Sequence, residues 1–591
     1  MAQNKTLGIF LIWRKKHIND RYFIILLSAF IGLCAGIAAY FLKSFVRYLK
    51  EILIGGANVE DKNFWLVVLP MIGVLLTLIF IRFILRDDVR HGIPRILFVI
   101  SKRKGRMKTH KLFSSLIGGS LTAGFGGSVG LESPIISTGS SIGSALGNIM
   151  KLDYKTTILL IGCGAAGAIA SIFTTPVAAV IFSLEVLMLD LTISSIIPLL
   201  MASVTGAITT KLLLAENVLF QFELTEKFTV SDVPFFILLG ILTGLISLYF
   251  NRMNNFIYDK MEAIKNTYIR ALIGVSVLGL LIFLVPPLYG EGYDSIKLIL
   301  SGNANSLFDN SLFYDFRDSF WALILFIFAF LLLKVIATTI TIESGGIGGI
   351  FAPSAVMGGL IGFLFAKIIN HFEFTKHLSE TNFALVGMAG VLGAVLHAPL
   401  TAIFLVAEIT KGYELIVPLM LTSSISFMTI KVFDPHSIFN RRLAEKGELL
   451  THHKDQAVLT LLSVKEVIDT DLDKISPESN LGDLTKIIAK SHRNIFPVVS
   501  DDNTFLGLVV MDDVREDMFK PEKYKTHIKK YIIQPNEIVS VRETMESVME
   551  KFKVTGYYNL PVIDEGKYIG FISRSNLFGA YRKILLDVSL E

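Results

Sequence analysis

A single carboxylate, that of Glu132, lies inside the glycine-rich stretch GSVGLESPII (residues 127–136), within a long apolar region. No cation follows in the next dozen residues that could neutralise it. Glycines ahead of a helix that proline can start leave backbone N–H groups free, at the positive end of the helix dipole. The stretch therefore predicts an anion site that is built from backbone amides and has no buried cation.

Two further turns have the same character. GGIFAP (348–353) and RHGIPRIL (90–97) each combine glycine with a proline, Pro353 and Pro94, at the expected start of a helix. Non-helical backbone at membrane depth must be buried in protein or line a cavity. Glycine and proline could instead serve only close helix packing and kinks, but that explanation weakens with three such turns. Together the turns favour an anion pathway.

The elements that hold these turns must be membrane helices. Of the 591 residues, 52% are hydrophobic and 18% are charged, whereas soluble domains carry roughly a quarter charged residues. Apolar runs at residues 23–42, 64–85 and 320–340 can each span a bilayer at about 20 residues per helix. We therefore predict a multi-pass integral membrane protein that contacts the lipid bilayer.

Short basic clusters at residues 13–21, 101–111 and 440–447 adjoin apolar runs. By the positive-inside rule they mark cytoplasmic segments, so we expect a cytoplasmic N-terminus (1–21) and a cytoplasmic C-terminal region. Their short length and their position beside apolar runs argue against nucleic-acid binding.

The apolar part of the chain, about residues 22–434, contains a duplication. GSVGLESPIISTGSSIG (127–143) resembles GGIGGIFAPSAVMGGLIG (345–362), and TTPVAAVIFSLEV (174–186) matches HAPLTAIFLVAEI (397–409). The interval from Pro134 to Pro353 is nearly the same as that from Pro176 to Pro399, so one duplication accounts for both pairs. Duplicated membrane halves commonly form inverted repeats with the substrate site at their interface. We expect the two repeats at about 22–215 and 233–434.

Beyond about residue 434 the chain becomes polar and charged, and it repeats again. NIFPVVSDDNTFLGLVVMDDV (494–514) lines up with YNLPVIDEGKYIGFISRSNL (558–577), with Pro497 matched to Pro561. The pattern of each copy predicts a strand, a polar turn, a second strand with glycine and the start of a helix. A helical stretch precedes each copy (480–491 and 544–554). We expect a linker and two small α/β domains, at 435–455, 456–520 and 525–591.

In their order along the chain, GIP (92–94), GLESP (130–134), GGIFAP (348–353) and the soluble pair resemble the CLC family of voltage-gated chloride channels and chloride/proton exchangers, whose members can carry a C-terminal cytoplasmic pair of CBS domains. The resemblance covers nearly the whole chain. It implies a multi-pass α-helical membrane protein, with an inverted repeat and re-entrant and broken helices, followed by an α/β CBS pair. It also implies a homodimer with a separate chloride pathway in each subunit.

In that family the three turns and the start of the last membrane helix surround a central anion, and the glutamate of the second turn is the gate. The resemblance therefore implies that Glu132 gates anion passage, and that the backbone amides of Ile350 and Phe351 bind the anion. The full anion-binding set that it implies is His91, Gly92, Ile93, Leu131, Ser133, Gly349, Ile350, Phe351 and Phe439.

Two of these positions depart from the family pattern. His91 stands where the best-studied members have a serine, and Phe439 stands where a tyrosine hydroxyl usually meets the anion. Without these hydroxyls, coordination would rest on amides, with the His91 imidazole as a further donor whose protonation would make occupancy depend on pH. His91 could equally only pack or cap a helix. Phe439 could close the inner side of the pathway as a hydrophobic constriction.

A third departure concerns protons. Exchangers of the family often carry a second glutamate directly after the acid aligned here with Glu185, but this chain has Val186, which cannot carry a proton. Some exchangers also lack that acid. We therefore expect a passive, glutamate-gated chloride channel with CBS regulation, and the alternative is a chloride/proton antiporter. Glu185 and Glu408 occupy equivalent positions in the two repeats, which favours a structural role for both at helix ends.

CBS pairs often hold adenine nucleotides through a hydroxyl and an acid after the second strand of each copy. The first copy has Asp513 but Val510 in place of the hydroxyl residue, and the second has Ser573 but Asn576 in place of the acid. Each copy thus keeps part of the pattern. An adenine nucleotide is one candidate ligand, and a purely structural or dimer-forming tail is the alternative.

Other classes of protein fit the sequence less well. A CBS-regulated magnesium transporter would need several carboxylates at membrane depth, where this chain has few. The chain has no HExxH pair, and the serine-rich stretch 137–144 has no convincing base partner. The cysteines Cys34 and Cys163 lie in apolar segments, which excludes a disulfide framework and a thiolate metal site. We therefore expect no enzymatic activity, no metal and no required cofactor.

Overall fold

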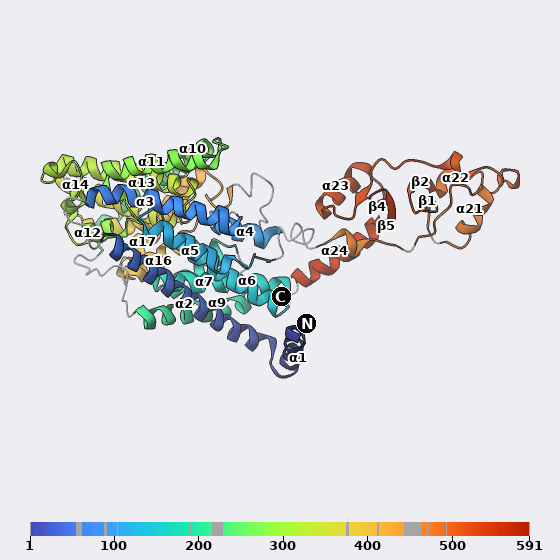
Figure 1. Cartoon of the computed structure of the whole chain (residues 1–591), viewed down its shortest axis with the longest axis horizontal. Helices are drawn as coiled ribbons and strands as arrows, with labels where there is room; N and C mark the ends of the chain where they lie inside the picture. Colours follow the sequence, from blue (N-terminus) through green and yellow to red (C-terminus); the bar gives the residue numbers. More distant parts are fainter. Residues whose placement is uncertain are drawn as a thin grey trace. The chain divides into compact units, whose positions relative to one another are not determined.

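The chain forms two compact units, Met1–Leu449 and Leu450–Glu591, and Figure 1 labels most of their helices and strands. The computed structural model describes residues 2–54, 62–87, 92–102, 105–188, 192–214, 228–373, 377–410, 413–441, 462–470, 472–491 and 493–589. Most of the expected linker at 435–455 lies outside these residues.

The first unit is built from helices. Within the described residues, nine helical segments are long and apolar enough to cross a membrane, which agrees with the multi-pass prediction. The first half contains α1 (Ala2–His17), α2 (Asp20–Ile54), α3 (Lys62–Ile79), α4 (Gly92–Lys102), α5 (Lys111–Gly124), α6 (Glu132–Ile149), α7 (Tyr154–Phe173), α8 (Pro176–Glu185) and α9 (Ile193–Leu214). The second half contains α10 (Val233–Glu262), α11 (Thr267–Leu284), α12 (Tyr293–Leu300), α13 (Phe320–Glu343), α14 (Phe351–His371), α15 (Glu380–Leu396), α16 (Pro399–Thr410) and α17 (Ile416–Phe433).

Equivalent helices of the two repeats begin in the same way. Asp153 caps α7 and Ser379 caps α15, each by accepting a backbone N–H of the first turn through its side chain. Such caps satisfy N–H groups that have no partner inside the helix. The short helices α8 and α16 instead begin at Pro176 and Pro399, because the fixed φ of proline suits a first turn.

The repeats also pack in the same way. In the first half α6 packs along α7, and in the second half α14 packs along α15. Gly139 meets Gly164 in the first pair and Gly358 meets Gly387 in the second, where an added Cβ would collide with the partner's backbone. Glycines allow such close approach of membrane helices. These glycines stand at matching positions of the duplicated sequence, so both halves use the same close contact.

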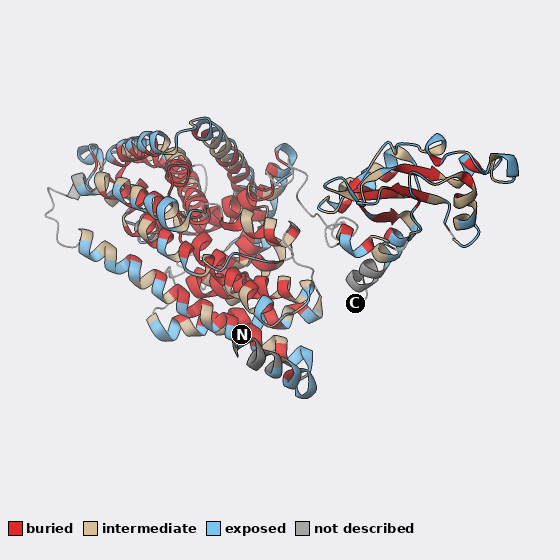
Figure 2. Cartoon of the chain, turned by 45° about the vertical axis from the view of Figure 1, so that its right-hand side comes forward, coloured by how far each residue is buried: buried red, intermediate tan, exposed pale blue. Residues whose placement is uncertain are grey.

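The interior of the first unit is closely packed, and Figure 2 shows its buried residues in red. Large apolar side chains are nevertheless exposed on its outer helices, among them Leu26, Leu212, Leu272, Leu280 and Met428. Apolar exposure on this scale is unusual for a protein surrounded by water and suits contact with lipid.

The second unit confirms the expected order of strand, turn, strand and helix in each copy. Strand β1 pairs with β2, and β4 pairs with β5, both in antiparallel fashion, while β3 runs parallel to β4. Its elements are α20 (Val464–Val467), α21 (Leu481–Ile488), β1 (Ile495–Val499), β2 (Phe505–Val510), α22 (Met511–Val514), β3 (Val539–Ser540), α23 (Met545–Thr555), β4 (Asn559–Asp564), β5 (Lys567–Ser573) and α24 (Arg574–Ser589). The two copies share a small buried cluster of Val499, Leu508, Tyr568 and Phe571.

Candidate anion site

The glycine-rich turns of the two repeats meet directly. Gly130 donates its N–H to the carbonyl of Gly349 at 2.9 Å, and Gly349 donates back to the carbonyl of Gly130 at 2.8 Å. We call this antiparallel pair of bonds the glycine bridge. Helix α6 begins two residues after Gly130 and α14 begins two residues after Gly349. The N-termini of the two equivalent helices therefore start side by side.

The third turn, at the start of α4, lies against the start of α6. Gly92, the first residue of α4, lies so close to Ser133 that an added Cβ would collide with the Ser133 hydroxyl. The structure thus brings the three turns together, as the sequence predicts. The candidate anion-binding residues that it buries there are Gly92, Ile93, Leu131, Ser133, Gly349, Ile350 and Phe351.

The Glu132 carboxylate folds back over the glycine bridge. Its side chain is 2% exposed, and an added Cβ on Gly130 would collide with Oε2, while one on Gly349 would lie 3.4 Å from the same atom. Position 130 therefore needs glycine if the carboxylate is to lie there. No donor with good hydrogen-bond geometry among the described residues reaches Oε2, although the backbone N–H of Ala352 in α14 faces the carboxylate.

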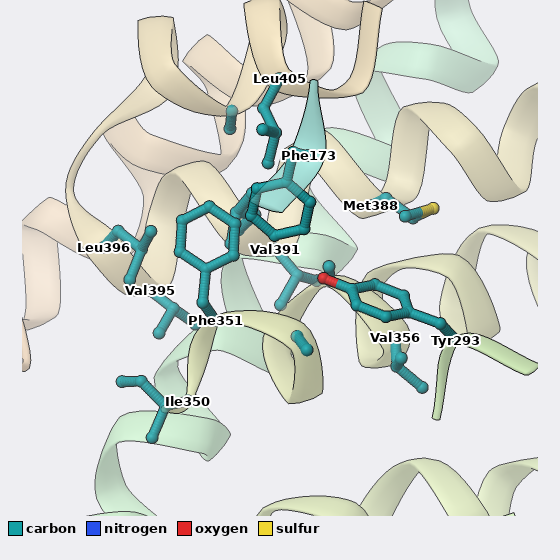
Figure 3. Close-up of a cluster of buried hydrophobic side chains, with 14 of the residues drawn as sticks. Phe173, Tyr293, Ile350, Phe351, Val356, Met388, Val391, Val395, Leu396 and Leu405 are labelled. Carbon is teal, nitrogen blue, oxygen red and sulfur yellow. The ribbon is translucent and has the colours of Figure 1, made fainter. Parts of the chain in front are cut away.

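The other oxygen of Glu132 is held by a tyrosine from the second repeat. The hydroxyl of Tyr293 donates to Oε1 at 3.1 Å. Phe173, the last residue of α7, packs its ring edge-on against Tyr293 at 6.4 Å and stacks on Phe351 at 5.7 Å. Figure 3 shows the Tyr293 hydroxyl pointing into this aromatic cluster. The cluster packs apolar rings beside the Tyr293 side chain that bonds to the carboxylate.

Sequence reasoning missed Tyr293, although a signal for it exists. Tyr293 follows the stretch GEG (290–292) and begins the short helix α12. Gly292, with φ of +97°, caps this helix, and α12 packs on α14 as α4 packs on α6. A glycine-rich turn before a short helix in the second half, matching that at Gly92 in the first, could have pointed to it.

A buried lysine stands behind the Glu132 turn. Lys334, in the middle of α13, has no exposed surface, and its ammonium group donates to the Ser128 hydroxyl at 2.9 Å and to the carbonyl of Gly290 at 2.8 Å. The expectation of a site without a buried cation is therefore wrong. Lys334 follows Ser128 by 206 residues, so local sequence around Glu132 could not reveal it.

The two positions that depart from the family pattern are placed differently. His91 lies outside the described residues. Phe439 is 7% exposed and belongs to the hydrophobic core beyond the end of α17. The side-chain amide of the next residue, Asn440, lies 3.9 Å from the sulfur of Met188. This core also contains Ile93, Leu131, Ile350 and Phe351 of the three turns.

The structure confirms the expected helix-end role of Glu185 and Glu408. The Glu408 carboxylate accepts the N–H groups of Val177 and Ala178 at the start of α8, at 3.2 and 2.9 Å. The Glu185 carboxylate accepts those of Leu400 and Thr401 at the start of α16, at 3.3 and 2.8 Å. Each glutamate therefore caps a helix of the opposite repeat. Val186 follows as a buried residue at the end of α8.

The candidate nucleotide residues of the second unit lie at the end of the second strand of each copy or in the helix that follows it. Asp513 is exposed on α22, and Asn576 is exposed on α24. The hydroxyl of Ser573 accepts the backbone N–H of Asn576 at 3.0 Å, so it caps the first turn of α24. Adenine-nucleotide binding at these residues stays a prediction.

Comparison with known proteins places the two units in described families. Residues 72–431 match the family described as voltage gated chloride channel, and residues 464–520 and 528–583 each match the CBS domain. The chloride channel protein CLC-f of Arabidopsis thaliana is 25% identical over 563 residues, which span 83% of this chain and 69% of that protein.

A bacterial relative and a solved structure are also similar to this chain. The H(+)/Cl(-) exchange transporter ClcA of Klebsiella pneumoniae (strain 342) is 27% identical over 414 residues, which span 68% of this chain and 84% of that protein. The crystal structure of a slow cyanobacterial Cl-/H+ antiporter has a TM-score of 0.61 and 24% sequence identity, covering 74% of this chain and 100% of that one. The structural likeness shows a shared fold.

Family match, fold and the meeting of the three turns all agree with the resemblance seen in the sequence. The protein is thus a multi-pass, anion-transporting membrane protein with a C-terminal CBS pair, and the chain belongs to the CLC family.

Proposed function

We propose that this chain exchanges chloride for protons across its membrane, and that Glu132 couples the two. The observation that supports this most strongly is the position of the Glu132 carboxylate over the glycine bridge, between the N-termini of α6 and α14. Free N–H groups and the positive ends of two helices attract one negative charge. A carboxylate and a chloride ion both satisfy that requirement.

In the proposed cycle the ionised Glu132 and the anion compete for the same amides. Protonation removes the charge of the carboxylate, weakens its attraction to the amides and lets chloride take its place. We assign the anion contacts to the backbone around Gly92 and Ile93, around Leu131 and Ser133, and around Ile350 and Phe351. The N–H of Gly349 is already donated to the carbonyl of Gly130, so Gly349 leaves the set that the resemblance implies. The hydroxyl of Tyr293 is then free to donate to the incoming anion.

A passive chloride channel gated by Glu132 is the second candidate. Val186 favours it, because that side chain cannot carry a proton. The relative from Klebsiella pneumoniae is named an H(+)/Cl(-) exchange transporter, and this favours exchange. An exchanger built on this chain needs a proton route that does not use the side chain at position 186.

We infer the membrane orientation and the assembly of the protein from its sequence. The basic clusters at 13–21 and 440–447 support a cytoplasmic N-terminus and a cytoplasmic CBS pair. The family resemblance supports a homodimer with one pathway in each subunit. A regulatory adenine nucleotide at the CBS pair remains part of the proposal.

Purified protein in liposomes tests the proposed function. A chloride gradient across the liposome membrane should drive protons uphill in the wild-type protein, measured with a pH electrode alongside a chloride electrode. Glu132→Gln mimics the protonated state, so it should abolish proton movement and leave anion flux that no longer depends on pH. The matched control is Glu262→Gln, at an exposed acid at the end of α10, which should behave as wild type.

Chloride flux without proton movement in the wild-type protein would overturn exchange in favour of the channel. Unchanged flux and unchanged pH dependence in Glu132→Gln would overturn the assignment of Glu132 itself.

A further inference from the structure

A second acid, Glu291, lies beside the site in the turn that delivers Tyr293. It stands between Gly290 and Gly292, two residues before Tyr293. Its surface exposure is intermediate, whereas Glu132 is almost fully buried. The turn is held in place by Gly290, whose N–H donates to the carbonyl of Gly126 at 2.8 Å. Glu291 is thus the more accessible of the two acids.

The buried ammonium group of Lys334 places one positive charge beside this turn. Its two hydrogen bonds go to neutral oxygens, those of Ser128 and Gly290, and a Cβ on Gly292 would lie 3.3 Å from its nitrogen. A charge buried this deeply needs an opposite charge near it. Glu291, which lies between these two glycines, interacts electrostatically with Lys334 and supplies that charge.

Glu132 has a different electrostatic neighbour. The charged side chain that acts on its carboxylate is Glu291, a group of the same sign. Two carboxylates that interact in an apolar setting do not both ionise readily, and they titrate as a pair. Because Lys334 balances one negative charge, the pair favours a state with one proton and one charge between the two acids.

We propose that Glu291 is the proton-exchange partner of Glu132. This inference rests on the proposed role of Glu132 as the group that is protonated and released. In the step itself, the O–H bond of protonated Glu291 breaks and an O–H bond forms on the Glu132 carboxylate. The negative charge moves to Glu291, next to Lys334, and Glu291 then takes a new proton from water at the surface. No other reactant is needed.

The groups around Glu291 support its ionised form after the proton has left. Three cations from α2 and α13 act on it, and two acids, Asp294 and Glu132, oppose them. The charged and titratable groups around this acid, including those one residue further out, are Lys43, Arg47 and Lys50 on α2, Asp294 and Lys297 on α12, Lys334 on α13, Glu132 on α6, and Tyr289 and Tyr293 in the turn. The excess of cations lowers the free energy of a charged Glu291.

Glu291→Gln in liposomes tests the inference. Proton movement driven by a chloride gradient should fall at least about tenfold, as expected for loss of a proton-transferring side chain, while chloride flux stays within about twofold of wild type. Glu291→Asp keeps the carboxylate and should restore proton movement. Asp318→Asn, at an acid with an 83% exposed side chain beside Arg317, is the matched control and should leave both fluxes unchanged.

Two further variants separate the proton role from a structural one. Glu291→Gln leaves Lys334 without its counter-charge and could prevent folding, so Glu291→Gln with Lys334→Met removes both charges together. That double variant should elute as wild type in detergent and show the same loss of proton movement. In a Glu132→Gln background, Glu291→Gln should add no further change, because both residues act in one step.

The outcomes for the two proposals differ. A proton-to-chloride ratio unchanged by Glu291→Gln would overturn the role of Glu291 while leaving exchange through Glu132 intact. If the wild-type protein moves no protons, exchange fails, and Glu291 is judged by the pH dependence of anion flux. Loss of its negative charge should then shift the midpoint of that dependence to lower pH, because a like charge no longer opposes the ionisation of Glu132. An unmoved midpoint would overturn the inference.

Discussion

Gly130 and Gly349, which lie in opposite repeats of the chain, exchange two backbone hydrogen bonds at the centre of the membrane unit. They stand at equivalent positions of the duplicated sequence, so the bridge joins the two repeats at the same point of each. The missing side chain of Gly130 leaves the space that Oε2 of Glu132 fills. The glycine bridge therefore joins the two repeats and also forms part of the candidate anion site.

Gly130→Ala should displace the Glu132 carboxylate. The added Cβ would collide with Oε2 and lie 3.0 Å from the Cβ of Ala352, so the carboxylate can no longer cover the bridge. Anion flux from liposomes should rise and lose most of its pH dependence. Gly349→Ala is the milder control, because its Cβ would lie 3.1 Å from that of Ser133 and 3.4 Å from Oε2. Wild-type pH dependence in Gly130→Ala would show that the carboxylate does not rest there.

Tyr293→Phe should make Glu132 easier to protonate. The Tyr293 hydroxyl donates to Oε1 and stabilises the charged carboxylate, and a hydrogen bond to a charged group contributes about 1.5–3 kcal/mol. The midpoint of the pH dependence of anion flux should therefore move up by about 1–2 pH units. Tyr289→Phe is the matched control, since the Tyr289 hydroxyl has no hydrogen-bond partner among the described residues. Equal midpoints in the two variants would contradict the role of the Tyr293 bond.

Glu185→Gln and Glu408→Gln should each destabilise the fold without changing transport. Each carboxylate caps a helix of the opposite repeat, and loss of a charged cap costs about 1 kcal/mol. Thermal unfolding of the purified protein in detergent should show a lower midpoint for both variants. Glu414→Gln, at an exposed acid in a short turn before α17, should leave the midpoint unchanged. A changed proton-to-chloride ratio in either glutamate variant would argue for a transport role instead.

Asp517→Asn should weaken the first CBS copy in a way that depends on pH. Lys523 and Tyr531 both donate hydrogen bonds to Asp517 and hold the pKa of its carboxyl below the usual value. Because the folded-state pKa is lowered, the stabilisation is present at neutral pH and is lost as pH falls through that lowered pKa. Protease resistance of the CBS pair within the full chain should fall for the variant at neutral pH, and the difference should shrink in acid.

Asp501→Asn, at an exposed residue of the same copy, is the control for this experiment. A difference between Asp517→Asn and wild type that stays constant across pH would contradict an ionic origin of the stabilisation.

Sequence alone determined the features that depend on local composition and on internal repetition. Apolar runs mark the membrane helices, alternating strands with glycine turns mark the CBS pair, and the paired prolines reveal the duplication. Glu132 stood out because a carboxylate between glycines and a proline is rare in an apolar region. These signals are local, so they can be recognised without knowing which segments lie together in the folded protein.

Only the tertiary structure decided which groups surround Glu132. Tyr293 reaches it across 161 residues, and Lys334 lies behind its turn from a helix that the sequence marks only as an apolar run. Glu185 and Glu408 likewise find their partners in the opposite repeat. Each of these contacts exists because the fold brings segments of its two halves together, and no local pattern records which distant side chain fills the space between them.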